Sequence, residues 1–294
     1  MRSSIIVVLT LAALGLAGCS SLRIGYATAP DLVYWWLDAY IDFNRSQSPR
    51  VHEAIDQWFA WHRRTQLPDY AAVLAKARAE VVADTTAARV CDWEDQVVQR
   101  ARIAFERFSP AVVDTLLTVT PEQVRFLERR YARNDAQYRD DFLQPDLRER
   151  NRKSVQRITE RAETLYGSLD EREHGLVADA VARSPFDPTL WLTEREARQQ
   201  EVLQMLRTVG GTGATREQAQ AALSAYVAHL EHSPRDPYET YSRRLAQYNC
   251  QFAASLHNAT TAAQRRHAAE TLAGWEDDLR TLAATEPAHR HVEP

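Results

Sequence analysis

The sequence is poor in glycine, has few cysteines and carries no strong excess of charge of either sign. Only 9 of its 294 residues are glycine, 3 are cysteine, and the formal net charge is −4. This balance gives no electrostatic reason to expect nucleic acid as a partner. The apolar run Ile5–Leu16 is too short to span a bilayer, which takes about 20 apolar residues.

Short motifs that mark common enzyme classes are also missing. There is no HExxH, no GxSxG and no Ser-x-x-Lys pattern. Gly210–Gly213 lacks the Lys-Ser/Thr pair of a phosphate loop, so we interpret it as a linker. The adjacent acids Glu94-Asp95 and Asp277-Asp278 would diverge on a helix, and a solvated face explains them better than the two carboxylates of a glycosidase cleft.

What remains is strongly helical. Apolar residues recur at steps of three and four, which places one apolar stripe along each helix. The stripes include Val90, Trp93, Val97, Ala101, Ala104 and Phe108 in one segment and Val155, Ile158, Ala162, Leu165 and Leu169 in another. The sequence therefore predicts an all-α bundle of about ten helices with short capped turns and no sheet.

Helix starts are marked by capping residues. Thr120-Pro121 and Asp236-Pro237 combine a capping side chain with proline at the first helical position, and Ser48-Pro49 and Asp187-Pro188 mark two further starts. Capping boxes are expected at Asp170 with Glu173, Thr215 with Gln218, and Thr261 with Gln264.

The N-terminus predicts a lipoprotein signal. Arg2 precedes the apolar run, and Leu16-Ala17-Gly18-Cys19 forms a lipobox. Cleavage after residue 18 would leave Cys19 to be lipidated, and two or three acyl chains hold a protein durably on a membrane. An ordinary signal peptide with a chance cysteine is the alternative. Ser20 follows where an aspartate would favour inner-membrane retention, so the periplasmic face of the outer membrane is expected.

These features divide the chain into four parts. Residues 1–18 are expected to be a cleaved signal peptide, 19–28 a lipidated tether, 29–286 a helical domain and 287–294 a flexible tail. The glycine-rich residues 210–214 are a candidate boundary between two lobes of the helical domain.

Two cysteines remain after Cys19. In an oxidising compartment Cys91 and Cys250 are a natural pair, and we predict a disulfide between them. The alternative is two separate buried thiols, which behave as small apolar side chains. No base that would activate a catalytic cysteine is evident in the sequence.

The histidines do not form a recognisable metal motif. His229 and His232 are three residues apart, but a cationic cap at a helix C-terminus explains them better than a zinc site. Glu171 and His174 have the spacing of one di-iron ligand pair, but such a site needs two pairs and two further glutamates on facing helices of one bundle, and we assign them to a helix surface. We therefore expect no cofactor and no metal.

Two surfaces are candidates for contact with a membrane. The segment Arg125–Arg161 holds eleven basic residues against seven acidic ones, which suits either phosphate headgroups or a solvated, ion-paired face. The aromatic residues near the anchor suit either the headgroup region or packing between two early helices. They are Tyr34, Trp35, Trp36, Trp58, Trp61 and His62.

Several segments spread along the mature chain resemble a family of Gram-negative helical lipoproteins classified only as a domain of unknown function. The resemblance implies lipidation and an all-helical body, and it brings no activity or site residue. The segments are Trp61-His62-Arg63-Arg64 to Leu67-Pro68-Asp69-Tyr70, Cys91-Asp92-Trp93, Leu127-Glu128-Arg129-Arg130-Tyr131, Ser184-Pro185-Phe186-Asp187-Pro188, Leu256-His257-Asn258 and Gly274-Trp275-Glu276-Asp277-Asp278-Leu279.

Three functions follow from these expectations. The leading hypothesis is a non-enzymatic envelope protein, held to the membrane through Cys19, that binds or scaffolds another envelope protein or lipid. The second is an enzyme acting on the cell wall or on lipid, with a site gathered from distant helices. The third is a carrier of a small apolar ligand between helices.

Overall fold

The computed structural model describes residues 21–144 and 146–285, and this part of the chain contains ten helices and no strand. The all-α prediction is confirmed. The signal peptide, Cys19 and the tail 287–294 lie outside the described residues. The helices are α2 (Ser21–Ile41), α3 (Ser48–Glu80), α4 (Ala87–Leu116), α5 (Pro121–Phe142), α6 (Leu147–Tyr166), α7 (Glu171–Arg183), α8 (Pro188–Val209), α9 (Arg216–Glu231), α10 (Asp236–Ala259) and α11 (Ala262–Ala284).

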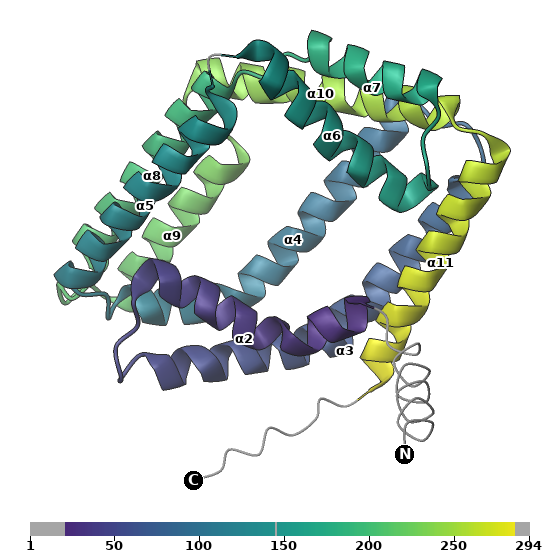
Figure 1. Ribbon diagram of the computed structural model, residues 1–294. Coiled ribbons are helices and arrows are strands. Elements are labelled where there is room, and N and C mark those ends of the chain that lie inside the picture. Colours follow the sequence, from purple (N-terminus) through teal and green to yellow (C-terminus); the bar gives the residue numbers. More distant parts are fainter. Residues whose placement is uncertain (1–20, 145, 286–294) are drawn as a thin grey trace, which may run out of the picture.

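The helices form an open frame, with α4 crossing it (Figure 1). One side of the frame is made by α2 and α3, and α11 packs along α3 to make the next side. The opposite sides are made by α6, α7 and α10, and by α5, α8 and α9. α4 joins the α10 side to the corner where it meets α9 and α3.

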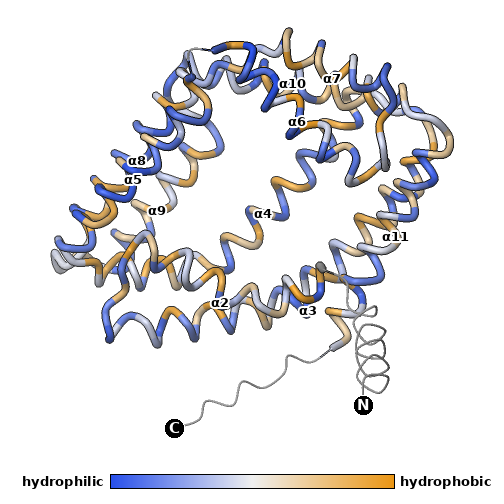
Figure 2. The backbone as a smooth tube through the Cα atoms, viewed as in Figure 1, coloured by the Kyte–Doolittle hydropathy of each residue, from blue (hydrophilic) through white to orange (hydrophobic). Residues whose placement is uncertain are grey.

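The frame is held by three separate hydrophobic cores. The largest joins α4, α5, α8 and α9 through Val113, Leu127, Leu203 and other buried residues. A second joins α3 and α11, with Leu67 against Leu279. A third joins α6, α7 and α10. Figure 2 shows the consequence, since apolar residues are spread around the frame and are not gathered at one centre.

The helix starts agree closely with the sequence. Complete capping boxes occur at Thr120, Asp170, Thr215 and Thr261, and Asp187 caps α8. The prediction at Asp236-Pro237 needs correction, because Arg235 occupies the N-cap position and makes no side-chain cap. Glu239 accepts instead from the backbone N–H of Ser233 at 3.1 Å, which stabilises the preceding turn.

The expected tether, residues 19–28, is helical from Ser21 onward. Tertiary contacts explain the difference, because this segment packs on the rest of the protein. Arg23 pairs with Asp278 of α11 at 3.0 Å, and the Tyr26 ring makes an edge contact with Phe59 of α3. Such contacts stabilise a helix that its sequence alone leaves marginal.

The apolar stripe of α4 is largely not buried. Val97 is 62% exposed and Val98 51% exposed, and Ala101 also faces solvent. Helical periodicity correctly indicates a helix here, but a crossing helix has neighbours mainly at its two ends. The expectation that this stripe packs against other helices along its length is therefore wrong for its middle.

The glycine-rich segment lies in the turn between α8 and α9. Buried residues on both sides of it, including Leu206, Val209 and Ala219, belong to the same core. Gly211 donates its backbone N–H to the Leu117 carbonyl at 3.3 Å. The segment is thus a packed turn within one core.

Candidate functional site

A groove of about 780 Å³ lies between the first half of α3, the second half of α4 and the end of α2. We call it the α3/α4 groove. Its walls are mostly apolar and include Ile41, Val51, Trp58, Phe108, Val112 and Leu116. The volume lies within the ~300–1,000 Å³ typical of small-molecule sites. The groove is thus large enough for one slender apolar molecule.

One end of the groove is fixed by a buried amide pair. The Gln123 side chain donates to Gln47 Oε1 at 2.7 Å and to the Asp42 carbonyl at 2.9 Å. Gln47 in turn donates to the Thr118 carbonyl at 3.0 Å. These bonds join the α2–α3 loop to the α4–α5 loop, so both loops hold one position relative to the groove.

The other end is fixed by Trp58, whose indole N–H donates to the Ala104 carbonyl of α4 at 2.8 Å. This contact sets the spacing between α3 and α4 while the apolar ring borders the groove. Indole is suited to this place, because it is mostly apolar but has one donor that must be satisfied.

Charged side chains also line the groove. Arg50 and Arg107 are exposed, and neither forms an ion pair with a carboxylate of the described residues. Of the two acids beside them, Asp114 pairs with Arg216 and Glu53 accepts from Gln57. Two arginines without a carboxylate partner therefore lie beside an apolar surface, which suits a ligand with an anionic head and an apolar chain.

A smaller polar pocket of about 240 Å³ lies between α5, α8 and α9. Its most buried charge, Glu194, is 3% exposed and accepts from Arg198 at 2.7 Å and from Arg235 at 2.5 Å. Burial alone would raise the pKa of Glu194, but the hydrogen bonds from the two arginines outweigh it and lower the pKa to about 2. Such a carboxylate is a poor proton carrier near neutral pH, and its contacts serve to tie α8 to α10.

The aromatic residues of the N-terminal region separate into two groups. Trp58 and His62 are stacked with ring centroids 4.6 Å apart, and the partly buried Tyr26 and Tyr70 complete a cluster around the buried His62. Trp35 and Trp36 instead face solvent on α2. Packing between early helices therefore explains the first group and not the second.

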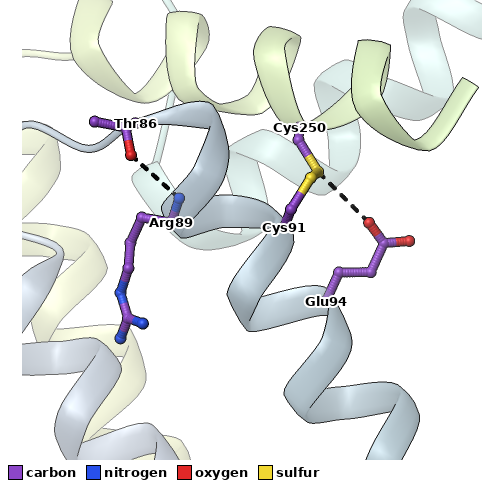
Figure 3. The surroundings of a disulfide bond; sticks show 5 residues. All are labelled: Thr86, Arg89, Cys91, Glu94 and Cys250. Atoms are coloured by element: carbon purple, nitrogen blue, oxygen red, sulfur yellow. Dashed lines mark hydrogen bonds between the residues drawn. A yellow bond between two sulfur atoms is a disulfide. The ribbon is translucent and has the colours of Figure 1, made fainter. Parts of the chain in front are cut away.

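Cys91 of α4 and Cys250 of α10 are joined by a disulfide, with their Cα atoms 5.5 Å apart (Figure 3). Glu94 lies beside it, with a carboxylate oxygen 3.6 Å from the Cys250 sulfur. These three are the one metal-ligand group of three or more residues among those described. Because both sulfurs are in the disulfide, no thiolate is present to bind a metal.

The other predicted candidates do not converge. His229 contacts Glu201 at 3.1 Å, whereas His232 contacts Glu239 at 3.6 Å, so the two rings have different partners. Glu171 and His174 are both exposed on α7. These side chains therefore do not come together in one site.

The adjacent acids diverge, as their helical spacing requires. Glu94 and Asp95 are both exposed, while Asp277 is exposed and Asp278 is buried against Arg23. Asp278 therefore serves to attach α2 to α11.

Within Arg125–Arg161, several basic side chains are paired with acids on the same or neighbouring helices. Arg125 pairs with Glu122 at 2.6 Å, Arg152 with Glu149 at 2.7 Å, and Arg139 with Glu196. These pairs match the solvated, ion-paired interpretation of this segment.

The α3/α4 groove was not located by sequence reasoning. Its walls come from residues as far apart as Leu37 and Leu206, and no spacing rule connects them. The nearest signal in the sequence was the end of the α4 stripe at Phe108, which lines the groove.

None of helices α2 to α11 combines the length and apolar character that a membrane span requires. No curated protein and no solved structure matches the chain. One family model does match, over residues 39–213, and it is described as a family of unknown function (DUF6279). That match covers more than half of the 294 residues. The chain therefore belongs to this family.

Proposed function

We propose that this protein is a non-enzymatic lipoprotein, anchored through Cys19 to the periplasmic face of the outer membrane, that binds an amphiphile in the α3/α4 groove. The ligand would have an apolar chain and an anionic head. The observation that carries the proposal is the groove itself, with apolar walls and two arginines, Arg50 and Arg107, that lack a carboxylate partner.

The partners of two buried carboxylates, Glu194 and Asp135, support binding over catalysis at the smaller pocket. Glu194 is held ionised by two arginines, and Asp135 forms an ion pair with Arg195 at 3.1 Å and accepts a hydrogen bond from Gln199 at 2.9 Å. Catalytic carboxylates and bases need a proton affinity near that of their substrate. Carboxylates that are already bonded to fixed side chains are suited to stabilising the fold.

The groove also favours a lipid over an envelope protein as the partner. A specific protein interface buries roughly 800 Å² on each side and is centred on a packed apolar patch. A narrow groove between two helices fits a single chain better than a broad protein surface. Fatty acids and lysophospholipids have the required combination of chain and anionic head.

Photocrosslinking tests the groove. Cells expressing the full-length protein are given a diazirine-bearing palmitate, irradiated, and the crosslinked peptides are identified by mass spectrometry. We expect crosslinks on α3 and α4 residues of the groove. Ala111→Trp should block them by filling the groove, and Ala101→Trp, on the exposed middle of the same helix, is the matched control. Equal labelling of both variants would exclude the groove as the binding site.

The anchor needs a separate experiment. Cys19→Ala, or inhibition of the lipoprotein signal peptidase, should leave the protein unprocessed or unanchored. Acyl adducts on Cys19 of the wild-type protein are the direct readout by mass spectrometry. Normal outer-membrane fractionation of Cys19→Ala would show that lipidation at this residue is not what holds the protein.

A further inference from the structure

The exposed surface of α2 differs in charge from that of a typical solvent-facing helix. Its exposed residues are all uncharged, and Trp35 and Trp36 are 63% and 61% exposed. The full set is Leu22, Ile24, Gly25, Ala27, Thr28, Leu32, Trp35 and Trp36. A soluble amphipathic helix shows the opposite pattern, with its charges facing water.

None of the charged residues of α2 is among its exposed residues. Arg23 pairs with Asp278 of α11 at 3.0 Å. The Asp38 carboxylate accepts from the backbone N–H of Phe43 at 2.8 Å. Asp31 is also engaged in an interaction within the chain. The exposed residues of α2 therefore carry no charge, and each charged residue of this helix is engaged within the chain.

α5 provides an internal comparison, because its 22 residues are close to the 21 of α2. Seven of its exposed residues are charged: Glu122, Arg125, Arg129, Arg133, Arg139, Asp140 and Asp141. Two helices of similar length in one protein thus present opposite surfaces. Contact with water accounts for the charged surface of α5, whereas the uncharged surface of α2 requires a different environment.

We infer that the exposed face of α2 lies on the bilayer, with Trp35 and Trp36 at the level of the headgroups and Ile24 and Leu32 against the upper acyl chains. Tryptophan is enriched at this level, since its ring is apolar and its N–H needs a polar partner. Contiguous exposed apolar surface marks an interaction site. Interfacial helices bind membranes through such a face.

The position of α2 in the chain identifies the membrane as its partner. α2 begins at Ser21, two residues after Cys19. Acyl chains on Cys19 would hold the N-terminal end of α2 at the bilayer surface, within reach of its apolar face. This inference rests on the proposed anchoring. It also predicts how the protein is oriented, because the contacts of α2 with α3, α5 and α11 would fix the whole frame relative to the membrane.

Quenching of tryptophan fluorescence by brominated lipids tests the inference. The full-length lipidated protein is reconstituted into vesicles of phosphatidylethanolamine and phosphatidylglycerol with brominated acyl chains. We expect quenching of part of the emission from the seven tryptophans, and loss of most of that quenching in the double variant Trp35→Phe/Trp36→Phe. Trp93→Phe is the control, because the Trp93 ring lies under Arg89 at the start of α4, the end that the disulfide joins to α10, and its loss should leave the quenching unchanged.

Vesicle flotation separates failure of the inference from failure of the anchor. Protein that floats with vesicles, but whose bromolipid quenching is the same with and without Trp35 and Trp36, overturns the α2 surface and leaves the anchor intact. Protein that does not float overturns the anchor. A second copy of the chain is the alternative occupant of this surface. Sedimentation in detergent would then show a dimer, and Trp35 and Trp36 would be shielded from acrylamide in that dimer. This outcome would overturn the inference that the bilayer covers α2. The double variant Ile24→Glu/Leu32→Glu should still float with the vesicles, and it should lose the quenching by brominated lipids.

Discussion

The Tyr26 hydroxyl lies 3.0 Å from Nδ1 of His62, and the two rings are stacked with centroids 5.9 Å apart. This contact links α2 to α3 inside an aromatic cluster that also contains Trp58 and Tyr70. It shows that the first described helix is part of the folded body. It also places a titratable ring where water has little access.

The buried His62 should make stability depend on pH. Burial lowers the pKa of His62 to about 4, from 6.5 in an accessible histidine. Because the folded pKa is below the unfolded one, protonation favours the unfolded state. Stability from this group is fully present above pH 6.5 and is lost as the pH falls toward 4.

Urea denaturation between pH 7 and pH 4 measures this dependence. His62→Phe keeps an aromatic ring and should show a smaller loss of stability over that range than the wild type. His174→Ala, at an exposed position on α7, should keep the wild-type dependence. If His62→Phe and wild type lose stability equally, His62 is not the responsible group.

The Cys91–Cys250 disulfide should be a major source of stability. It closes a separation of 159 residues, for which the chain-entropy model gives about 5 kcal/mol as an upper value. It also fixes one end of α4, a helix with little packing along its middle. Reduction should lower the melting temperature clearly, as followed by circular dichroism. Thiol labelling of both cysteines in unreduced, denatured protein would show that the bond does not form.

The buried Gln47–Gln123 pair should be intolerant of truncation. Gln123→Ala leaves the Asp42 carbonyl without its donor and removes one of the two donors to Gln47 Oε1, which keeps the Asn44 N–H, and a buried unpaired polar group costs about 2 kcal/mol. Gln156→Ala is the matched control, because Gln156 is exposed and bonds only to Glu160 on its own helix. Chemical denaturation compares the two, and equal costs would remove the special role of the buried pair.

Two glycines should respond to alanine in opposite ways. A Cβ at Gly210 would lie 2.6 Å from the Leu206 carbonyl oxygen and 2.9 Å from that of Val119. Both are backbone atoms, so Gly210→Ala should destabilise the α8–α9 turn by more than about 1 kcal/mol. Gly175 lies inside α7 with open space around it, and Gly175→Ala should stabilise by roughly 0.5–1 kcal/mol. Differential scanning calorimetry distinguishes the two, and a neutral Gly210→Ala would contradict the proposed close packing.

Local structure was readily predicted because it depends on neighbours in the chain. Capping boxes such as Thr120 with Gln123 act over three residues, and they occur where their spacing indicated. The same argument failed at Asp236, where a contact from Glu239 to Ser233 competes for the first turn. It also failed for residues 21–28, whose helix depends on Asp278 and Phe59, far away in the sequence.

The amino-acid sequence by itself determined the helices, most of their starting points and the pairing candidates Cys91 and Cys250, and it predicts lipidation at Cys19. Periodicity, capping and targeting motifs are local properties, so they can be interpreted without coordinates. Only the tertiary structure decided that three separate cores build an open frame, that α4 crosses it exposed, and that the α3/α4 groove exists. It alone separated the partly buried Trp58 from the exposed Trp35 and Trp36. Helical periodicity shows which residues share a face, but only the packing of distant helices determines which faces are covered.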